Sequence, residues 1–293
     1  MTRRLVTGIA LAVIAVLVAG GAARPAGSNG APATGSPGYE ALKSQIEAAL
    51  AGDPASYSIY FLDLESGREF GINPDLPIPQ ASTVKVPLVL YVNRLVAQGK
   101  ANWTDRIAYQ PETDYRSGAG ALQTFASPGG TYSLRALCNL AITLSDNVAK
   151  AMLVRHFGAT DFERFMASLG AQQPHVDGQD PTTARDMAIY LQEVLRLARE
   201  EPELGSRMID DLSNTIWHVG LPGRLPAGIQ VAHKEGDITG VSNDVGIVFA
   251  RRPYILCVLS RGQSDTEAGF GKIAAISKMV YDYQEQANRG NLQ

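Results

Sequence analysis

The chain has 293 residues, of which 45% are hydrophobic and 19% charged, so it can bury a substantial core in one or two domains. Its formal net charge is −3, and its lysines and arginines are scattered along the chain. Such a protein offers no basic field to a nucleic acid, and we exclude nucleic acid as a partner.

The N-terminus predicts export. Residues 1–23, MTRRLVTGIALAVIAVLVAGGAA, place two arginines before an apolar stretch and then small residues, as a secretory signal peptide does. An uncleaved N-terminal anchor is the alternative, although the stretch is slightly short for a full membrane span. Residues 24–38 are rich in Gly, Pro, Ala and Ser, which is typical of a disordered linker. We therefore expect an extracytoplasmic protein, with membrane attachment only through this segment.

The rest of the chain predicts strands at both ends and helices between them. Two short apolar runs flank Ser66-Gly67, which indicates a β-hairpin. From Thr83 to about Met208 the apolar spacing is mainly helical. Three strand-like runs and a last helix follow, near residues 229–236, 241–250, 254–261 and 266–287.

This order of elements predicts an α+β fold in which both ends of the chain build one sheet. We expect a single domain over residues 39–290, with an α/β part at 39–80 and 216–290 and a helical part at 81–215. Catalytic groups from both parts can then meet in a cleft between them.

Ser82 and Lys85 stand three positions apart at the start of an apolar run, QASTVKVPLVLYV. On a helix this spacing brings the amine within reach of the hydroxyl. A serine needs such help because its free hydroxyl is a weak nucleophile. Taken alone, the pair is also explained by a helix N-cap and a solvated lysine, since Ser-x-x-Lys occurs on the order of once in a chain of this length.

Two further tripeptides favour the catalytic interpretation. Residues 145–147, SDN, follow the apolar run LAITL, and residues 234–236, KEG, end a predicted strand. Each tripeptide in isolation is explained by a helix cap or a turn. In this order, the three elements resemble the signatures S-x-x-K, S-D-N and K-T-G of the class A β-lactamase and penicillin-binding serine enzymes. The resemblance extends over roughly residues 40–287, and includes GAGAL at 118–122 and DPTTARDMA at 180–188.

The resemblance implies a β-lactamase/transpeptidase-like α+β fold, with a five-stranded antiparallel sheet flanked by helices and an inserted all-α subdomain. It also implies a serine hydrolase, either β-lactamase-like or D-alanyl-D-alanine peptidase-like, which needs no metal or other cofactor. The expected partner is a small-molecule β-lactam or a cell-wall peptide, and we expect a monomer.

Site roles follow from the same resemblance. Ser82 would attack the carbonyl of a β-lactam or of a D-Ala-D-Ala peptide, and Lys85 would take its proton. Ser145 would pass a proton to the leaving nitrogen, assisted by Lys234. The backbone N–H groups of Ser82 and Asp237 would form the oxyanion hole. The residues expected to bind substrate are Asn147, Glu235, Gly236 and Asp237.

One departure from the family concerns deacylation. The β-lactamases of this family carry a glutamate that activates the deacylating water. It stands on a loop between the S-D-N element and a DTT segment. Here that interval runs through AQQPHVDGQ directly to DPTTARD, and the loop with its glutamate is missing. Asp177 and Asp180 are the nearest acids that can replace it. We therefore expect acylation followed by slow deacylation.

EPEL, at residues 201–204, copies the family's glutamate motif but lies after DPTTARD, on the wrong side of that segment. We expect Glu201 and Glu203 to belong to a solvated helix end rather than to the site.

Glu235 is the second departure, because the family places Thr or Ser there to receive the substrate's carboxylate. Two like charges about 4 Å apart repel by roughly 4 kcal/mol at an effective dielectric near 20. Three alternatives follow: the side chain turns away, it pairs with a neighbouring Lys or Arg, or the substrate lacks a carboxylate at this point.

The cysteines and histidines predict neither a disulfide nor a metal site. Cys138 matches one half of a disulfide found in many class A enzymes, but the partner position is Val89. Cys138 and Cys257 each lie in an apolar run, which favours two buried thiols. The histidines show no metal-ligand spacing, and we expect His233 to pack beside the active strand.

Two other functions remain open. One is a penicillin-binding or sensing module that is acylated once and keeps the adduct, which the missing glutamate favours. The other is an esterase on the same scaffold, which Glu235 favours. The chain has no G-x-S-x-G motif, which disfavours a Ser-His-Asp hydrolase of the α/β type.

Overall fold

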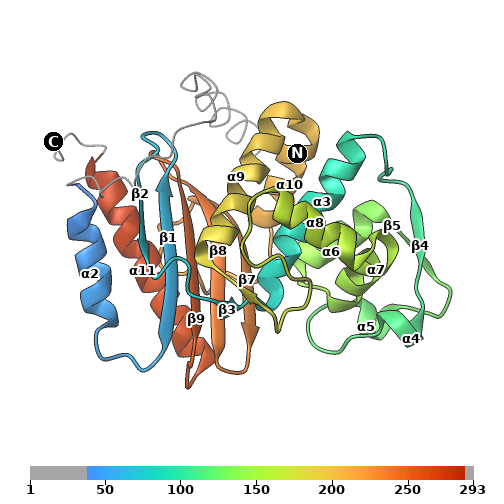
Figure 1. Cartoon of the computed structure of the whole chain (residues 1–293), viewed down its shortest axis with the longest axis horizontal. Helices are drawn as coiled ribbons and strands as arrows, with labels where there is room; N and C mark the ends of the chain where they lie inside the picture. Colours follow the sequence, from blue (N-terminus) through green and yellow to red (C-terminus); the bar gives the residue numbers. More distant parts are fainter. Residues whose placement is uncertain (1–37, 288–293) are drawn as a thin grey trace.

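The computed structural model describes residues 38–287, and a five-stranded antiparallel sheet lies at its centre (Figure 1). The strand order is β2-β1-β9-β8-β7. Strand β1 pairs with β9, so segments from both ends of the chain share one sheet. This arrangement confirms the predicted fold class. The strands are β1 (Ser56–Asp63), β2 (Glu69–Ile72), β7 (Gln230–Ile238), β8 (Val241–Phe249) and β9 (Tyr254–Arg261).

Two helices, α2 (Glu40–Leu50) and α11 (Thr266–Ala287), cover one face of the sheet (Figure 1). Apolar side chains of both helices and of the central strands form a continuous core there, which includes Phe61, Leu256 and Ile273. Burial of this face stabilises the sheet by roughly 25 cal/mol per Å² of apolar surface. Helix α2 was not predicted, because it buries only Leu42 and Ile46 and its apolar pattern is short.

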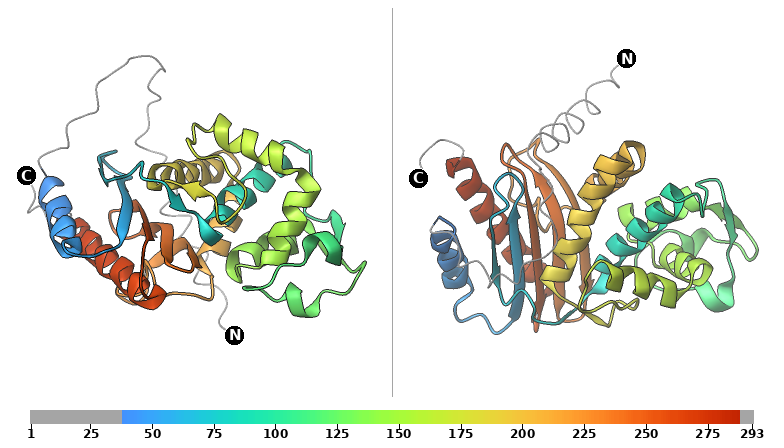
Figure 2. Two further views of the ribbon diagram at one scale, coloured as in Figure 1. Left: turned by 60° about the horizontal axis from the view of Figure 1, so that its bottom comes forward. Right: turned by 45° about the horizontal axis from the view of Figure 1, so that its top comes forward.

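The helical part of the chain lies on the other face, as Figure 2 shows. Helix α9 (Ala184–Glu200) packs on β1 and β9. Helix α3 (Lys85–Ala97) lies in the middle of the block, and each residue from 85 to 93 is buried, so it has no polar face at its start. The other helices are α4 (Pro111–Asp114), α5 (Leu122–Phe125), α6 (Leu134–Thr143), α7 (Asn147–Phe157), α8 (Ala159–Ser168) and α10 (Pro202–Ser213).

Short elements join the two parts beside the site. Strand β3 (Ile78–Pro79) pairs with β6 (Pro181–Thr182), and the 3₁₀ helix η1 (Ala81–Val84) follows β3 directly. Strands β4 (Arg106–Ala108) and β5 (Thr131–Ser133) form a second small pair at the far end of the helical block. Elements this short carry no periodic signal, and the sequence did not predict them.

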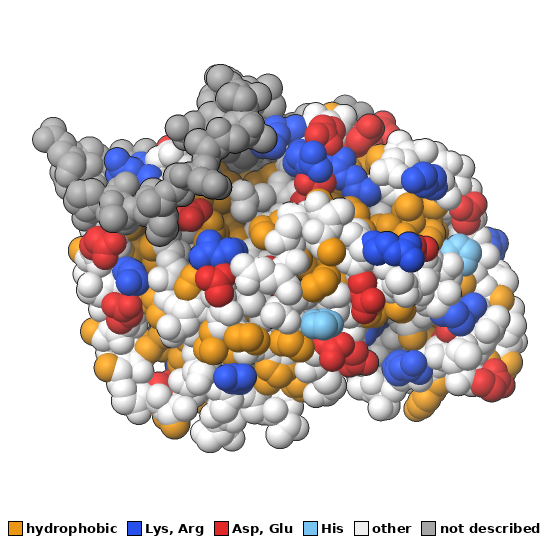
Figure 3. Space-filling model, viewed as in Figure 1, with side chains coloured by type: hydrophobic (Ala, Val, Ile, Leu, Met, Phe, Trp, Pro, Cys, Tyr) orange, Lys and Arg blue, Asp and Glu red, His pale blue; other side chains and the backbone are white. Residues whose placement is uncertain are grey.

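The signal peptide or anchor predicted for residues 1–23, and nearly all of the linker predicted for 24–38, lie outside the described residues. Within residues 38–287, no helix is long and apolar enough to cross a membrane. Acidic and basic side chains are interspersed on the face of the molecule seen in Figure 3. Cys138 and Cys257 are both buried and free, and burial raises the pKa of each thiol.

Candidate active site

Ser82 and Lys85 are joined by a hydrogen bond where η1 continues into α3. The Nζ of Lys85 lies 2.9 Å from Ser82 Oγ and 3.0 Å from Ser145 Oγ. It also contacts the carbonyl oxygen of Ser145 at 2.6 Å and Oδ1 of Asn147 at 2.7 Å. The structure thus brings four of the predicted site residues together around one amine.

The environment of Lys85 favours the neutral amine. Its side chain is buried, and burial lowers its pKa well below the usual range. The positive charges of Lys234 and Lys150 lower it further. A neutral amine 2.9 Å from Ser82 Oγ can accept the hydroxyl proton, which is what a nucleophilic serine requires.

The backbone is strained on both sides of this amine. Ala81, just before the serine, has φ +50°, and Ser145 has φ +52°. Residues with a Cβ rarely adopt such angles, which cost of order 1–3 kcal/mol each. Ala81 N–H donates to the carbonyl of Gly178 at 2.7 Å, which helps to hold the segment in place. In this conformation the hydroxyls of Ser82 and Ser145 both lie within 3.0 Å of Lys85 Nζ.

Asp146 anchors the turn that carries Ser145 and Asn147. Its Oδ1 accepts from the N–H of Ala149 and so caps α7, while its Oδ2 accepts from the N–H groups of Ala121 and Leu122. Gly120 has φ +113°, and a Cβ there would lie 2.4 Å from the carboxyl carbon of Asp146. Gly120, the second glycine of GAGAL, is therefore required by this close approach.

Strand β7 brings Lys234 and Gly236 against the serine. A Cβ on Gly236 would lie 2.8 Å from Ser82 N and 2.9 Å from Thr83 N, so only glycine allows this contact. Lys234 is fully buried, and burial lowers its pKa to about 8. Its Nζ donates to the carbonyl of Glu235 at 2.7 Å and lies 5.7 Å from the ring centroid of Trp217. Among the described residues no hydrogen bond joins Lys234 to Ser145.

Glu235 turns to the opposite side of β7 from Lys234, as strand alternation requires. Its Oε1 accepts from the N–H groups of Val219 at 3.1 Å and Gly220 at 3.0 Å. Within residues 38–287 it forms no ion pair with a lysine or arginine, so the pairing alternative is wrong. Burial and the nearby Asp244 raise its pKa to about 7. Glu235 nevertheless lines a cavity that Ser82 and Lys234 also line.

His233 is buried on the same side of β7 as Glu235, which agrees with the prediction that it packs at the active strand. Its Nδ1 lies 3.0 Å from Asp244 Oδ1, and its Nε2 lies 3.3 Å from Thr215 Oγ1. Burial opposes a charge on His233, but Asp244 outweighs it and the pKa is raised. Donor atoms of His233, Glu235 and Asp244 lie within 4.8 Å of one another, as metal ligands do. The protein's own hydrogen bonds already occupy these donors, so they fit a structural network better than a metal site.

Two cavities adjoin Ser82. The first, which we call the Trp217 cavity, has a volume of about 450 Å³ and contains Ser145, Lys234 and Asp237 in its lining. The second, the Lys150 cavity, has a volume of about 690 Å³ and extends from Ser82 between α7, α8 and residues 176–180. Asn147 and Asp237 line both cavities. Of the four predicted substrate-binding residues, Asn147, Glu235 and Asp237 line at least one of these cavities, whereas Gly236 lines neither.

The acids around the site differ in what the sequence could predict. Asp177 and Asp180 line the Lys150 cavity together with Ser82. Glu163, on α8, lines it too and was not predicted, because a single glutamate on an amphipathic helix gives no signal of its own. Glu201 and Glu203 are exposed where α9 meets α10, and they line neither cavity next to Ser82.

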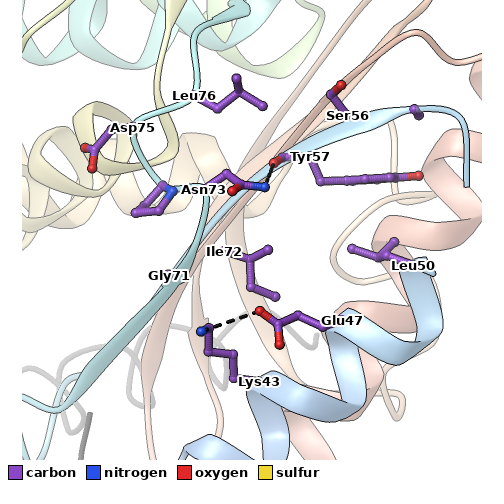
Figure 4. Close-up of a pocket in the computed structure, with 12 residues that line it drawn as sticks. Lys43, Glu47, Leu50, Ser56, Tyr57, Gly71, Ile72, Asn73, Asp75 and Leu76 are labelled. Atoms are coloured by element: carbon purple, nitrogen blue, oxygen red, sulfur yellow. Dashed lines mark hydrogen bonds and ion pairs between the residues drawn. The ribbon is translucent and has the colours of Figure 1, made fainter. Parts of the chain in front are cut away.

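A third hollow, of about 870 Å³, lies between α2 and the β1-β2 hairpin, and Ser82 does not line it (Figure 4). Lys43 and Glu47 form an ion pair on its wall, with 3.5 Å between Nζ and Oε1. None of the predicted site residues lines it. We therefore place the active site at Ser82.

Comparisons with known proteins agree with this geometry. The model of the β-lactamase enzyme family matches residues 41–284. Over an alignment of 295 positions, the chain is 25% identical to β-lactamase ROB-1 of Haemophilus influenzae, covering 88% of both chains. It is 24% identical to β-lactamase 1 of Streptomyces cacaoi, over 95% of this chain and 97% of the relative.

Solved structures share the whole fold. PBP-A superposes with a TM-score of 0.79 at 27% identity, over 84% of this chain and 97% of PBP-A. A mutant of PBP-A, solved as an acyl-enzyme complex with penicillin G, has a TM-score of 0.78 at 27% identity with the same coverage. An ancestral class A β-lactamase gives 0.75 at 26% identity, over 82% of this chain and 99% of its own.

Proposed function

The chain belongs to the β-lactamase enzyme family and is a serine hydrolase, and we propose that it forms an acyl-enzyme at Ser82 with β-lactams or with peptides ending in D-Ala-D-Ala. The observation that carries the proposal is the position of Lys85 Nζ, 2.9 Å from Ser82 Oγ and 3.0 Å from Ser145 Oγ. One amine can thus take the proton of the nucleophile and relay it to a second hydroxyl.

Acylation begins when neutral Lys85 takes the proton of Ser82, whose oxygen attacks the substrate carbonyl. The negative charge that develops on the carbonyl oxygen is stabilised by the backbone N–H groups of Ser82 and Asp237, worth roughly 3 to 4 kcal/mol per donor. Ser145 then gives its proton to the leaving nitrogen and recovers one from Lys85, because Ser145 Oγ and Lys85 Nζ are 3.0 Å apart.

Lys234 supports this step through its charge. It lies at the wall of the Trp217 cavity with Ser145, and the closeness of its ammonium to Lys85 favours the neutral form of Lys85. The side-chain amide of Asn147 donates to the carbonyl of Ser117 and accepts from Lys85, and its place in the lining of both cavities supports a role in binding the acyl side of the substrate.

Slow deacylation is part of the proposal. Hydrolysis of the acyl-enzyme needs a base that activates water on the side of the ester opposite to Ser145. The acids that face Ser82 across the Lys150 cavity, Glu163, Asp177 and Asp180, stand on a helix and a short loop rather than on the glutamate-bearing loop of the family. The enzyme is then closer to a penicillin-binding peptidase than to an efficient antibiotic hydrolase.

Intact-protein mass spectrometry after mixing with benzylpenicillin tests the proposal, with Ser82→Ala as the control. A mass increase of one penicillin that persists in the wild type and is absent from the variant supports it. An adduct that disappears while the drug is consumed would show efficient deacylation and overturn the slow-hydrolysis part. No adduct at all would overturn the β-lactam substrate.

A second candidate function is a penicillin-binding module that holds its adduct, for which the same missing glutamate is the supporting observation. It differs from a peptidase only in the lifetime of the adduct with a D-Ala-D-Ala peptide. The esterase alternative rests on the presence of Glu235 in the lining of the Trp217 cavity. A panel of p-nitrophenyl esters measured beside nitrocefin separates the esterase from both.

The location and assembly belong to the same proposal. We propose that residues 1–23 export the chain or anchor it, that residues 24–38 act as a linker, and that the domain of residues 39–290 works outside the cytoplasm as a monomer. The composition of the N-terminal segment supports export.

A further inference from the structure

The Lys150 cavity carries charges of both signs, and among the described residues its basic and acidic side chains form no ion pair with one another. Ser82 lines it, so an acyl group attached to the serine can extend into it. The inference concerns the acyl group of the substrate, and it therefore rests on the proposed acylation of Ser82.

Lys150 supplies the first uncompensated charge. It follows Asn147 by one turn on α7, and its side chain is partly buried in the cavity wall. Burial lowers its pKa, and the negative charges of Asp177 and Asp180 only partly offset that effect. Among residues 38–287 nothing forms a hydrogen bond or ion pair with its Nζ. A cation in such a place is stabilised when a ligand brings an anion to it.

Arg116 supplies a second cation on the same wall. Its Nη1 donates to the carbonyl oxygens of Thr113 and Tyr115, at 3.0 and 2.7 Å, and not to a carboxylate. Arg155, which also lines the cavity, shows the contrast, because Asp114 holds it in an ion pair at 2.6 Å. Arg116 and Lys150 therefore form the part of the cavity that favours an anion.

The opposite charges come from Glu163 on α8 and from Asp177 and Asp180 on the loop. Asp177 accepts from the N–H of Gln179 at 2.9 Å, and within the described part of the chain none of the three acids pairs with a lysine or arginine. The backbone carbonyls of residues 177, 178 and 180 are tied to Gln80 and Ala81, which holds this loop beside the serine. These acids form a part of the cavity that favours an ammonium group.

We propose that the Lys150 cavity binds an acyl-donor side chain that ends in both a carboxylate and an ammonium group, as a free amino acid end does. A side chain with a carboxylate alone would face three acids, and one with an ammonium alone would face Lys150 and Arg116. A neutral side chain would leave both sets of charges without partners. A zwitterion satisfies both sets at once, which is how charged sites gain specificity.

Four cephalosporins with one nucleus and one 3-acetoxymethyl group test the proposal on the full-length chain. Cephalosporin C carries both terminal charges, its N-acetyl derivative only the carboxylate, its terminal carboxamide only the ammonium, and cephalothin neither. Second-order rates of Ser82 acylation are measured for each by mass spectrometry, and each is divided by the rate for cephalothin. We expect the ratio for cephalosporin C to be about tenfold or more, and to exceed those of both single-charge compounds by about fivefold.

Lys150→Met should reduce the cephalosporin C ratio by about fivefold or more. Dividing by cephalothin cancels any effect of the variant on Lys85. Lys100→Met, which removes an exposed lysine away from the site, should leave the ratio unchanged. Ratios near one for all compounds, or a preference that needs only one of the two charges, would overturn the inference. Failure of cephalothin itself to acylate Ser82 would instead overturn the proposed function.

Discussion

The central strand β9 and the edge strand β7 belong to one sheet but are built from different residues. In β9, every residue from Tyr254 to Ser260 is buried, and most are aliphatic. In β7, three consecutive titratable residues are buried instead, His233, Lys234 and Glu235. A buried aliphatic side chain stabilises the fold, whereas a buried charge costs free energy unless it is well paired.

The difference shows that the site contains buried amines and strained residues that lower stability but serve the reaction. Lys85 and Lys234 lie within the site with lowered pKa values, and Ala81 and Ser145 hold strained backbone angles. The outer face, under α2 and α11, has a continuous apolar core. Variants of the titratable side chains of the site should therefore lose activity without losing stability, and variants of the outer core should do the reverse.

The largest effect is expected from Lys85→Met. Acylation by benzylpenicillin should fall by about 10²-fold to 10⁴-fold, because the general base is lost. The free energy of unfolding should rise, since an amine whose pKa is lowered by burial is replaced by an apolar side chain of similar length. Mass-spectrometric acylation rates and urea unfolding measure the two effects.

Lys100→Met is the matched control for that variant, because it removes an exposed lysine. It should change neither quantity. A Lys85→Met protein that acylates at the wild-type rate would show that another group takes the proton of Ser82.

Phe61→Ala tests the other side of the comparison. Phe61 is fully buried in the outer core and stacks on Phe70, with 5.0 Å between ring centroids. Its loss should lower the free energy of unfolding by about 3 to 5 kcal/mol, while the acylation rate of the folded protein stays within about twofold of wild type. Phe125→Ala is the control, because Phe125 is 75% exposed and its removal should cost less than about 0.5 kcal/mol. A large loss of acylation in folded Phe61→Ala would mean that the two faces of the sheet are coupled.

Gly236→Ala should show a smaller effect on both quantities, because it lies where the sheet meets the serine. The new Cβ would lie 2.8 Å from the backbone nitrogen of Ser82. Neither atom can move by a side-chain rotation, so the backbone of η1 must shift. We expect a loss of about 1 to 3 kcal/mol in stability and of about tenfold to 100-fold in acylation rate.

Gly271→Ala on α11 is the matched control, because a Cβ at this position would meet no atom of a neighbouring element within 4 Å. That variant should raise stability slightly, as alanine does in a helix, and leave acylation unchanged. Equal effects of the two variants would argue against a close contact between Gly236 and η1.

The parts of the fold that follow from periodicity were predictable from the sequence. The two-residue alternation and apolar runs of β1, β7, β8 and β9 predicted the sheet, and helical spacing predicted the inserted block. Helix α2 and the pairs β3-β6 and β4-β5 were missed, because their short segments are stabilised by contacts distant in sequence. Local patterns carry no information about such contacts.

The site was predictable where chemistry depends on fixed spacing and order. Ser82, Lys85, Ser145 and Asn147 were expected together, and the structure joins them through Lys85 Nζ. The partners of Glu235 were not predictable, because they are backbone N–H groups, which every residue except proline carries. Trp217 was missed for a similar reason, since it reaches Lys234 from a loop with no motif.

The smallest expected effect concerns Glu235, which lines the Trp217 cavity and whose carboxylate is held by two backbone N–H groups on the side of β7 opposite to Lys234. Glu235→Gln keeps an oxygen that can accept both N–H groups and removes only the charge. We expect β-lactams to acylate the variant faster than the wild type by about fivefold at about pH 8.5, since a like charge held farther away than about 4 Å repels by about 1 kcal/mol. Glu235→Thr should also raise the rate.

The pH dependence of this advantage identifies its cause. Burial and Asp244 raise the pKa of Glu235 to about 7, so the wild-type side chain is mostly neutral below that pH and charged above it. The ratio of the Gln variant's rate to the wild-type rate should therefore approach one well below that pKa and rise as the pH passes through about 7. His233, Lys234 and Asp244 surround Glu235 in both proteins, and Lys85 titrates in both, so their contributions largely cancel in the ratio. A ratio near one at every pH would mean that the repulsion between Glu235 and the substrate's carboxylate is absent, and a constant ratio above one would mean that the charge of Glu235 is not its cause.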